Sequence, residues 1–158
     1  MILTTAAAAT ITLLLLVIGG LTTDVGPWYQ ALRKPRWNPP NWLFAPAWTV
    51  ILALAATAGV LAWSHAPDSA AHLKIAGLFA VNIVLYALWS PLFFNLRRPD
   101  WALIEVPFLW LSILALMIGL APFSVVASLL LTPYLLWVGF AAILNLTIVR
   151  LNPIGATG

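Results

Sequence analysis

Aromatic and amide side chains recur at helical spacing in the apolar stretches of the chain. Asn82, Tyr86 and Trp89 are separated by four and then three residues, so on a helix they share one face. Further side chains expected to face the interior of a helix bundle are Trp48, Ser90, Tyr134, Trp137, Ala141 and Asn145. Aromatic walls with a few polar groups are suited to binding and orienting a flat, apolar ligand. The alternative is that these residues only pack helices together, with polar side chains bonding across them.

Catalytic and metal-binding constellations are not evident. The four acids are Asp24, Asp68, Asp100 and Glu105. Only Glu105 lies inside an apolar run, and we expect it to pair with Arg97 or Arg98 rather than to act chemically. The chain has no cysteine, and its two histidines have no partners at metal-ligand spacing. We therefore predict neither a metal site nor a cofactor.

A segment rich in Trp and Pro follows the first apolar run. Residues 28–42 contain three Trp, one Tyr and three Pro. One interpretation is an interfacial aromatic belt, in which Trp and Tyr lie at the level of the lipid headgroups. A belt does not require three prolines, however, and Pro at this density stiffens the backbone and prevents a continuous helix. We expect residues 24–43 to form a shaped lid over the mouth of the bundle.

Composition indicates whether the chain folds in water or in a lipid bilayer. Hydrophobic residues make up 63% of the 158-residue chain and charged residues only 7%, whereas soluble domains are about half apolar and a quarter charged. A soluble globular domain is therefore excluded. The net charge of +3 is distributed between apolar runs rather than gathered on a polar face, so we also expect no binding to nucleic acid. The partner of most of the surface is the lipid bilayer.

Five apolar runs predict an all-α integral membrane bundle of five transmembrane helices, forming a single domain over residues 1–158. The expected spans are 2–23, 44–64, 73–96, 101–120 and 124–151. Six of the seven Lys and Arg residues fall after the first span, after the third span and at the C-terminal end. The bias of basic residues toward the cytoplasm places the lid and the C-terminus inside and the N-terminus outside. An inner membrane of bacterial type suits this pattern.

Several motifs together resemble the tryptophan-rich sensory protein/translocator protein family (TspO, peripheral benzodiazepine receptor). The matching residues are Trp28-Tyr29-x-x-Leu32-x-Lys34-Pro35-x-Trp37-x-Pro39-Pro40-x-Trp42-x-Phe44, then Trp48, Trp89-Ser90-Pro91-x-Phe93-Phe94, Pro133-Tyr134-x-x-Trp137, Leu144-Asn145 and Leu151-Asn152. The resemblance implies a five-helix bundle, usually dimeric, that binds porphyrins such as protoporphyrin IX under the first loop. It places pocket aromatics at Tyr29, Trp48 and Trp137, beside Ala141 and the face of the third span.

The resemblance and the residues together define our expected site and its alternatives. The expected ligand-binding residues are Tyr29, Trp37, Pro39, Trp48, Asn82, Tyr86, Trp89, Ser90, Tyr134, Trp137, Ala141 and Asn145. The leading hypothesis is a porphyrin-binding sensor, scavenger or carrier, with basic lid residues meeting the ligand carboxylates. The alternatives are a light-dependent porphyrin-degrading enzyme acting through Trp48 and Trp137, and a facilitator for a hydrophobic solute. Small residues at Ala76, Gly77 and Ala80 make a homodimer through the third helix plausible.

Two departures from the family pattern bear on the ligand. Asn82 and Tyr86 stand on the third span where the family commonly has Gln and Asn, so the pocket exchanges one amide for a phenol. Leu146 and Thr147 stand where an aromatic residue is expected before Arg150 in the sterol motif. We therefore expect an altered ligand preference and no tight cholesterol binding.

Overall fold

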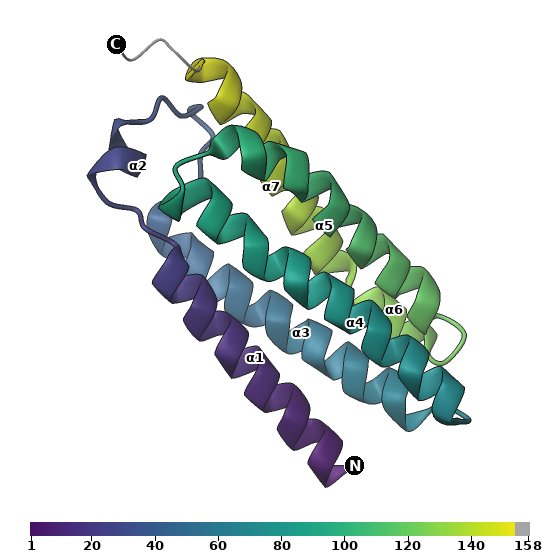
Figure 1. Ribbon diagram of the computed structural model, residues 1–158. Helices are drawn as coiled ribbons and strands as arrows, with labels where there is room; N and C mark the ends of the chain where they lie inside the picture. Colours follow the sequence, from purple (N-terminus) through teal and green to yellow (C-terminus); the bar gives the residue numbers. More distant parts are fainter. Residues whose placement is uncertain (154–158) are drawn as a thin grey trace.

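A computed structural model describes residues 1–153 and shows a bundle of long helices, with no strand among those residues (Figure 1). The helices are α1 (Ile2–Thr22), α2 (Pro27–Ala31), α3 (Phe44–Ser64), α4 (Ser69–Ser90), α5 (Pro99–Leu120), α6 (Val125–Leu130) and α7 (Thr132–Leu151). A 3₁₀ turn at Asn41–Leu43 leads into α3, and a π turn at Pro91–Asn95 extends α4. Within residues 1–153, five helical stretches are long and apolar enough to cross a membrane. The predicted fold class is confirmed.

Proline and capping residues determine where the long helices begin and break. Asp68 accepts a hydrogen bond from the backbone N–H of Ala71 at 2.8 Å, which starts α4 several residues before the apolar run that predicted it. Pro91 has no N–H for the α-helical ladder, and the backbone there widens into a π turn closed by Leu96 N–H on the Pro91 carbonyl. Pro133 lies where the last span divides into α6 and α7. The π turn at Pro91–Asn95 and the division between α6 and α7 therefore lie toward opposite ends of the bundle.

Helix α5 occupies the centre of the bundle and α1 its edge. Helix α5 packs between α4 and α7, and nine of its residues are buried. Helix α1 packs mainly on α3 and buries only Leu15. In Figure 1, α1 runs along one side of the bundle and diverges from it toward the N-terminus. With 21 residues it is about 32 Å long, enough to span a hydrocarbon core of about 30 Å.

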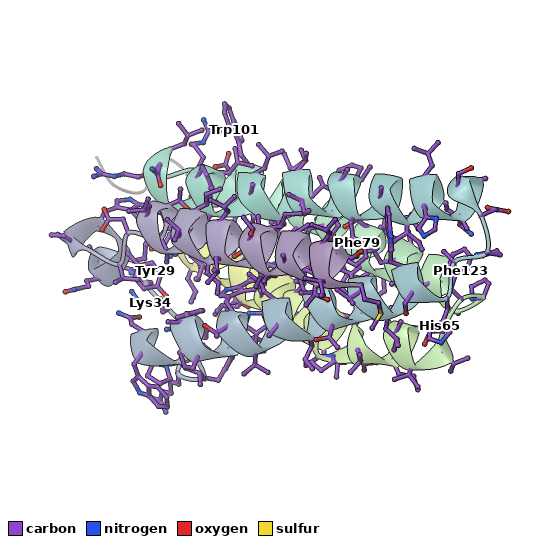
Figure 2. All side chains as sticks on the ribbon, turned by 90° about the horizontal axis from the view of Figure 1, so that it is seen from below. Tyr29, Lys34, His65, Phe79, Trp101 and Phe123 are labelled. Atoms are coloured by element: carbon purple, nitrogen blue, oxygen red, sulfur yellow. The ribbon has the colours of Figure 1, made fainter. Side chains whose placement is uncertain are left out.

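The lid, the α4–α5 connection and the C-terminal end of α7 all lie at one end of the bundle (Figure 1). Figure 2 shows Tyr29 and Lys34 at this end, and His65 and Phe123 at the other. Six of the seven basic residues therefore gather at the lid end, and Lys74 lies in the first turns of α4 at the opposite end.

Candidate functional site

The lid is an ordered structure docked on the aromatic residues of the π turn. The Tyr29 ring is 3% exposed and packs against Phe93 and Phe94, with ring centroids 6.4 and 5.4 Å away. Trp28 packs edge-on against Phe93 at 6.1 Å. At the far end of the lid, Trp37 reaches α7 and packs edge-on at 5.7 Å from Phe140. The lid thus spans the bundle mouth from the π turn to α7.

Lys34 stabilises the short helix inside the lid. Its ammonium group donates hydrogen bonds to the carbonyl groups of Tyr29 and Leu32, the latter at 3.1 Å, and lies 4.4 Å from the centroid of the Tyr29 ring. A cation at the C-terminus of a helix meets unpaired carbonyl groups and the negative end of the helix dipole. Burial lowers the pKa of the Lys34 amine and raises the pKa of the Tyr29 phenol. Lys34 is therefore engaged by the lid itself.

Hydrogen bonds tie the start and the middle of the lid to the bundle. The hydroxyl groups of Thr23 and Ser90 lie 2.9 Å apart and join the start of the lid to the end of α4. In the middle of the lid, the Arg33 backbone N–H donates to Asn152 Oδ1 at 2.9 Å, and Asn152 Nδ2 donates to the Arg33 carbonyl at 2.9 Å. Asn152 Nδ2 also donates to the carbonyl of Ile148 at 2.8 Å. We call the paired Asn152–Arg33 bonds the lid clasp.

Trp48 lies at the centre of the aromatic residues beneath the lid. Its ring centroid is 5.1 Å from Tyr86, 6.0 Å from Tyr134 and 6.4 Å from Trp137, each in an edge-on arrangement. Edge-on contacts at these distances are favourable, because the positive ring edge meets the negative face of its neighbour. Trp48 in the first turns of α3 therefore connects α4 and α7. The sequence placed these three neighbours on two separate helical stripes, and the structure brings them onto one side chain.

Two cavities meet at Trp48. The first is small, about 60 Å³, and we call it the aromatic cavity. Of the expected ligand-binding residues, its walls include Tyr29, Trp48, Trp89, Trp137, Ala141 and Asn145. The second, of about 360 Å³, lies between α1, α3 and α4, and we call it the lid-side cavity. Its walls include Trp48, Tyr86, Trp89 and Ser90. Four residues line both cavities and form the partition between them, namely Thr23, Phe44, Trp48 and Trp89.

Four expected site residues lie away from these two cavities. Asn82 and Tyr134 join in a buried chain, in which Tyr134 donates to Asn82 Oδ1 at 3.3 Å and Asn82 donates to Ser112 Oγ at 2.8 Å. Both line a third cavity on the side away from the lid. Trp37 and Pro39 line none of the three cavities described between residues 1 and 153; Trp37 is 48% exposed and Pro39 is buried inside the lid.

Comparison with known proteins assigns this arrangement to a family. The model of the TspO/MBR family matches residues 6–151, which is nearly the whole span of helices described above. The chain belongs to the TspO/MBR family. The integral membrane bundle inferred from hydropathy is thus a TspO/MBR membrane protein, and the resemblance drawn from the Trp- and Pro-rich motifs is confirmed.

Relatives in the family include bacterial and animal proteins. The chain is 40% identical over 127 residues to the tryptophan-rich protein TspO of Chlorobaculum tepidum, covering 80% of each chain. It is 35% identical over 129 residues to the tryptophan-rich sensory protein of Cereibacter sphaeroides, covering 79% of this chain and 77% of the relative. It is 30% identical over 126 residues to the human translocator protein, covering 79% of this chain and 75% of the relative.

Asn145 has a structural role at the base of the candidate site. Its side-chain amide, oriented to satisfy both groups, donates to the Pro99 carbonyl at 3.0 Å and accepts from the Leu103 N–H at 3.0 Å. Asn145 is 1% exposed. It therefore fixes the first turn of α5 against α7 while its side chain also borders the aromatic cavity. The sequence left open whether Asn145 joins helices or lines a ligand pocket, and its position is compatible with both.

The expected pairing of Glu105 with an arginine was wrong. Arg98 instead holds Asp100 through two bonds, from Nε at 2.8 Å and from Nη2 at 2.5 Å. The reason is proximity, since Asp100 is two residues from Arg98, whereas Glu105 is 8% exposed and faces the bundle interior. Among the described residues, neither oxygen of the Glu105 carboxyl has a hydrogen-bond partner.

The sequence analysis did not identify the phenylalanines of the candidate site or the residues that α1 and its C-terminal end contribute to it. Phe44, Phe93 and Phe140 line the aromatic cavity, and Phe44 also borders the lid-side cavity. Phe44 and Phe93 stood in the recognised motifs, which was a usable signal. Gly19 and Thr23 also line these cavities. No motif covered α1, so nothing in the sequence singled them out.

Proposed function

We propose that this TspO/MBR protein binds a flat, largely apolar ligand of the porphyrin type beneath the lid. The observation that carries the proposal is the position of Trp48, which touches Tyr86, Tyr134 and Trp137 and separates two cavities covered by the lid. A planar macrocycle offers large faces to such rings, and each favourable aromatic pair adds about 0.5–1.5 kcal/mol beyond burial.

The cations at the lid suit the polar edge of such a ligand. Arg33 and Arg36 are exposed, and the Arg33 side chain is not part of the lid clasp, which uses only its backbone groups. A guanidinium group binds a carboxylate through two parallel hydrogen bonds. Lys34 is held by carbonyl groups of the lid. We therefore assign the propionate contacts to Arg33 and Arg36 and a structural role to Lys34.

Ligand entry requires the lid and the aromatic partition to move. Ligand pockets usually hold about 300–1,000 Å³, and the aromatic cavity of about 60 Å³ is far too small for a macrocycle. The lid-side cavity of about 360 Å³ lies directly beyond Trp48 and Trp89. Rotation of these two side chains would merge the spaces, and release of the lid would admit the ligand. Binding is therefore coupled to lid opening in our proposal.

The test is an equilibrium titration of the purified protein with protoporphyrin IX, followed by quenching of Trp fluorescence. We expect saturable binding that is weakened at least tenfold in Trp48→Ala and in Trp137→Ala, equivalent to about 1.4 kcal/mol each. Trp101→Ala is the matched control, because Trp101 is 46% exposed on the outer face of α5. Unchanged affinity in both pocket variants would reject the site, and non-saturable quenching in the unmodified protein would reject the function.

The same proposal covers role and orientation. We infer that the protein acts as a sensor, scavenger or carrier of its ligand, and the relatives named as sensory protein and translocator protein support these roles. We further propose a bacterial inner membrane, with the lid and C-terminus in the cytoplasm, on the basis of the basic residues at the lid end. Because the chain has no cysteine, a single Cys at Gln30 or at Ser69 can be labelled from either side. Labelling of the Gln30 position from outside intact cells would contradict this orientation.

We also propose a homodimer through the outer face of α4. Ala76, Gly77 and Ala80 are exposed there, and a Cβ added at Gly77 would meet nothing within 4 Å. Small residues on an exposed face let two helices approach closely in a bilayer. A Cys introduced at Gly77 should form a disulfide between two copies in membranes, whereas one at Ile104 on the outer face of α5 should not. Equal cross-linking at both positions would contradict the interface.

A further inference from the structure

A third cavity lies in the half of the bundle away from the lid. Its volume is about 560 Å³, larger than either cavity beneath the lid, and it is lined mainly by α1, α3 and α4. Its walls include Ala8, Leu15, Ala56, Gly59 and Phe79, and Figure 2 labels Phe79. Asn82 and Tyr134, two of the expected ligand-binding residues, also line it, as do Ala76 and Ala80 of the proposed dimer face. We call this space the α1 crevice.

The crevice exists because small side chains face one another without closing the gap. Helix α1 contributes Ala7 and Ala8, and α3 contributes Ala56 and Gly59. Such residues normally let neighbouring helices pack closely. Here α1 diverges from the bundle toward its N-terminus (Figure 1) and buries only Leu15. An empty space of this size would forfeit dispersion contacts along every wall, so an occupant is favoured.

The dimensions of the crevice decide what fits. Its lining on α1 runs from Leu3 to Leu15, and its lining on α3 from Leu52 to Trp63, which corresponds to a length of about 17 Å at 1.5 Å per residue. Dividing about 560 Å³ by this length, and adding the radius of a water molecule of about 1.4 Å at each wall, gives a channel about 9 Å wide. A helix with side chains is about 10–12 Å wide and does not fit. A single hydrocarbon chain does, since its carbon atoms contact neighbours at about 3.5–4.0 Å.

The chemistry of the walls also favours a hydrocarbon chain. Thr12 donates to the carbonyl of Ala8 at 2.8 Å, and the hydroxyl of Tyr134 donates to Asn82, which in turn donates to Ser112. These polar groups are thus bonded within the protein, and the rest of the lining is largely apolar. The helices that enclose the crevice are membrane spans, so its opening faces lipid. We propose that the α1 crevice is a binding site for one acyl chain of a bilayer phospholipid, separate from the site beneath the lid.

The test uses phosphatidylcholine with a photoreactive diazirine on one acyl chain, in phosphatidylcholine vesicles containing the protein. Leu14 is 56% exposed on α1, whereas Leu15 is 8% exposed and lines the crevice. We expect adducts on Leu15 and Phe79 as frequent as those on Leu14. In Ala56→Phe, which fills the crevice, adducts on Leu15 and Phe79 should fall to background while those on Leu14 persist. Ala53→Phe, on the exposed face of α3, should change nothing.

A second matched pair protects the test from a folding defect. Ala8→Phe fills the crevice from α1, and Ala9→Phe places the same ring on the lipid-facing side of that helix. The proposal would be overturned if, in the unmodified protein, only exposed residues such as Leu14 formed adducts and Leu15 formed none. So would cross-links from Leu15 to a second copy of the chain in place of lipid. Neither outcome bears on protoporphyrin binding, so this proposal and the proposed function fail independently.

Discussion

The hydrogen bonds of the lid clasp hold the lid on the bundle, and Asn152→Ala removes them. The substitution deletes the two hydrogen bonds between the Asn152 amide and the Arg33 backbone, each 2.9 Å long, together with the bond to Ile148. The methyl side chain of alanine can replace none of these bonds, and the packing of Tyr29 on Phe94 remains. The perturbation therefore acts on the free energy of lid docking and leaves the aromatic floor intact.

The magnitude follows from the number and exposure of the bonds. A net hydrogen bond contributes about 0.5–1.5 kcal/mol, and the two bonds to Arg33 lie in an exposed region. The freed Arg33 groups would then be hydrated, so no penalty for unpaired buried groups is added. Taking the lower part of the range gives about 1–2 kcal/mol for the pair, which raises the open population of the lid about 5–30-fold.

Limited trypsin digestion measures this population, because the Arg36–Trp37 bond lies within the lid. When opening and closing are fast, the cleavage rate tracks the open fraction. We expect Asn152→Ala to be cut about 5–30-fold faster than the unmodified protein. Asn152→Asp, which keeps the acceptor for the Arg33 N–H, should lie between them. Arg150→Gln, at an exposed position on the same helix end, is the control. A rate for Asn152→Ala equal to that control would refute the reasoning.

Four further substitutions, one of them a control, test other parts of the account. Asn82→Leu breaks the buried polar chain and should lower stability in detergent by about 1–2 kcal/mol, seen as a lower Tm. Burial raises the pKa of Tyr29 above the ordinary tyrosine value of about 10. An absorbance titration of Tyr29→Phe should therefore lack one phenol that ionises above that value in the unmodified protein. The stability that neutral Tyr29 contributes is complete below about pH 10 and is lost as the pH rises further. Gly119→Ala should destabilise by about 1–3 kcal/mol, since its Cβ would overlap Leu78 Cδ1. As the control, Gly77→Ala should be neutral or slightly stabilising, because its Cβ would meet nothing within 4 Å.

Each of these expectations has a clear contrary result. An unchanged Tm for Asn82→Leu would mean that the chain through Ser112 carries no net stability. Loss of a phenol titrating near pH 10 in Tyr29→Phe would place Tyr29 in water. Equal effects of alanine at Gly119 and Gly77 would contradict the close approach of α4 and α5.

The number and placement of the spans were predictable from the sequence, because lipid requires long apolar helices that satisfy their own backbone groups. Hydropathy alone could not show that Asp68 starts α4 before its apolar run, or that Pro133 divides the last span into α6 and α7. These features depend on capping and on missing backbone donors, which act on one turn at a time.

The site was predictable where residues repeat on one helix and unpredictable where helices meet. Spacing correctly grouped Tyr134, Trp137 and Asn145 on one helix, but Tyr134 lines the α1 crevice while Trp137 lines the aromatic cavity. Which cavity each side chain lines depends on how α7 is rotated and how it crosses its neighbours. The spacing of residues within one helix does not give this information. The same reason explains Glu105, whose burial depends on the neighbours of α5.

The central claim is that the flat ligand lies beneath the lid, between Trp48 and Trp137. The most direct measurement is an experimental structure of the protein with protoporphyrin IX bound. Our account predicts the macrocycle in the merged aromatic and lid-side cavities, with Trp48 turned away from its present edge-on contact with Tyr86 and the carboxylates toward Arg33 and Arg36. A macrocycle in the α1 crevice, or on the outer face of the bundle with the lid site unchanged, would contradict it.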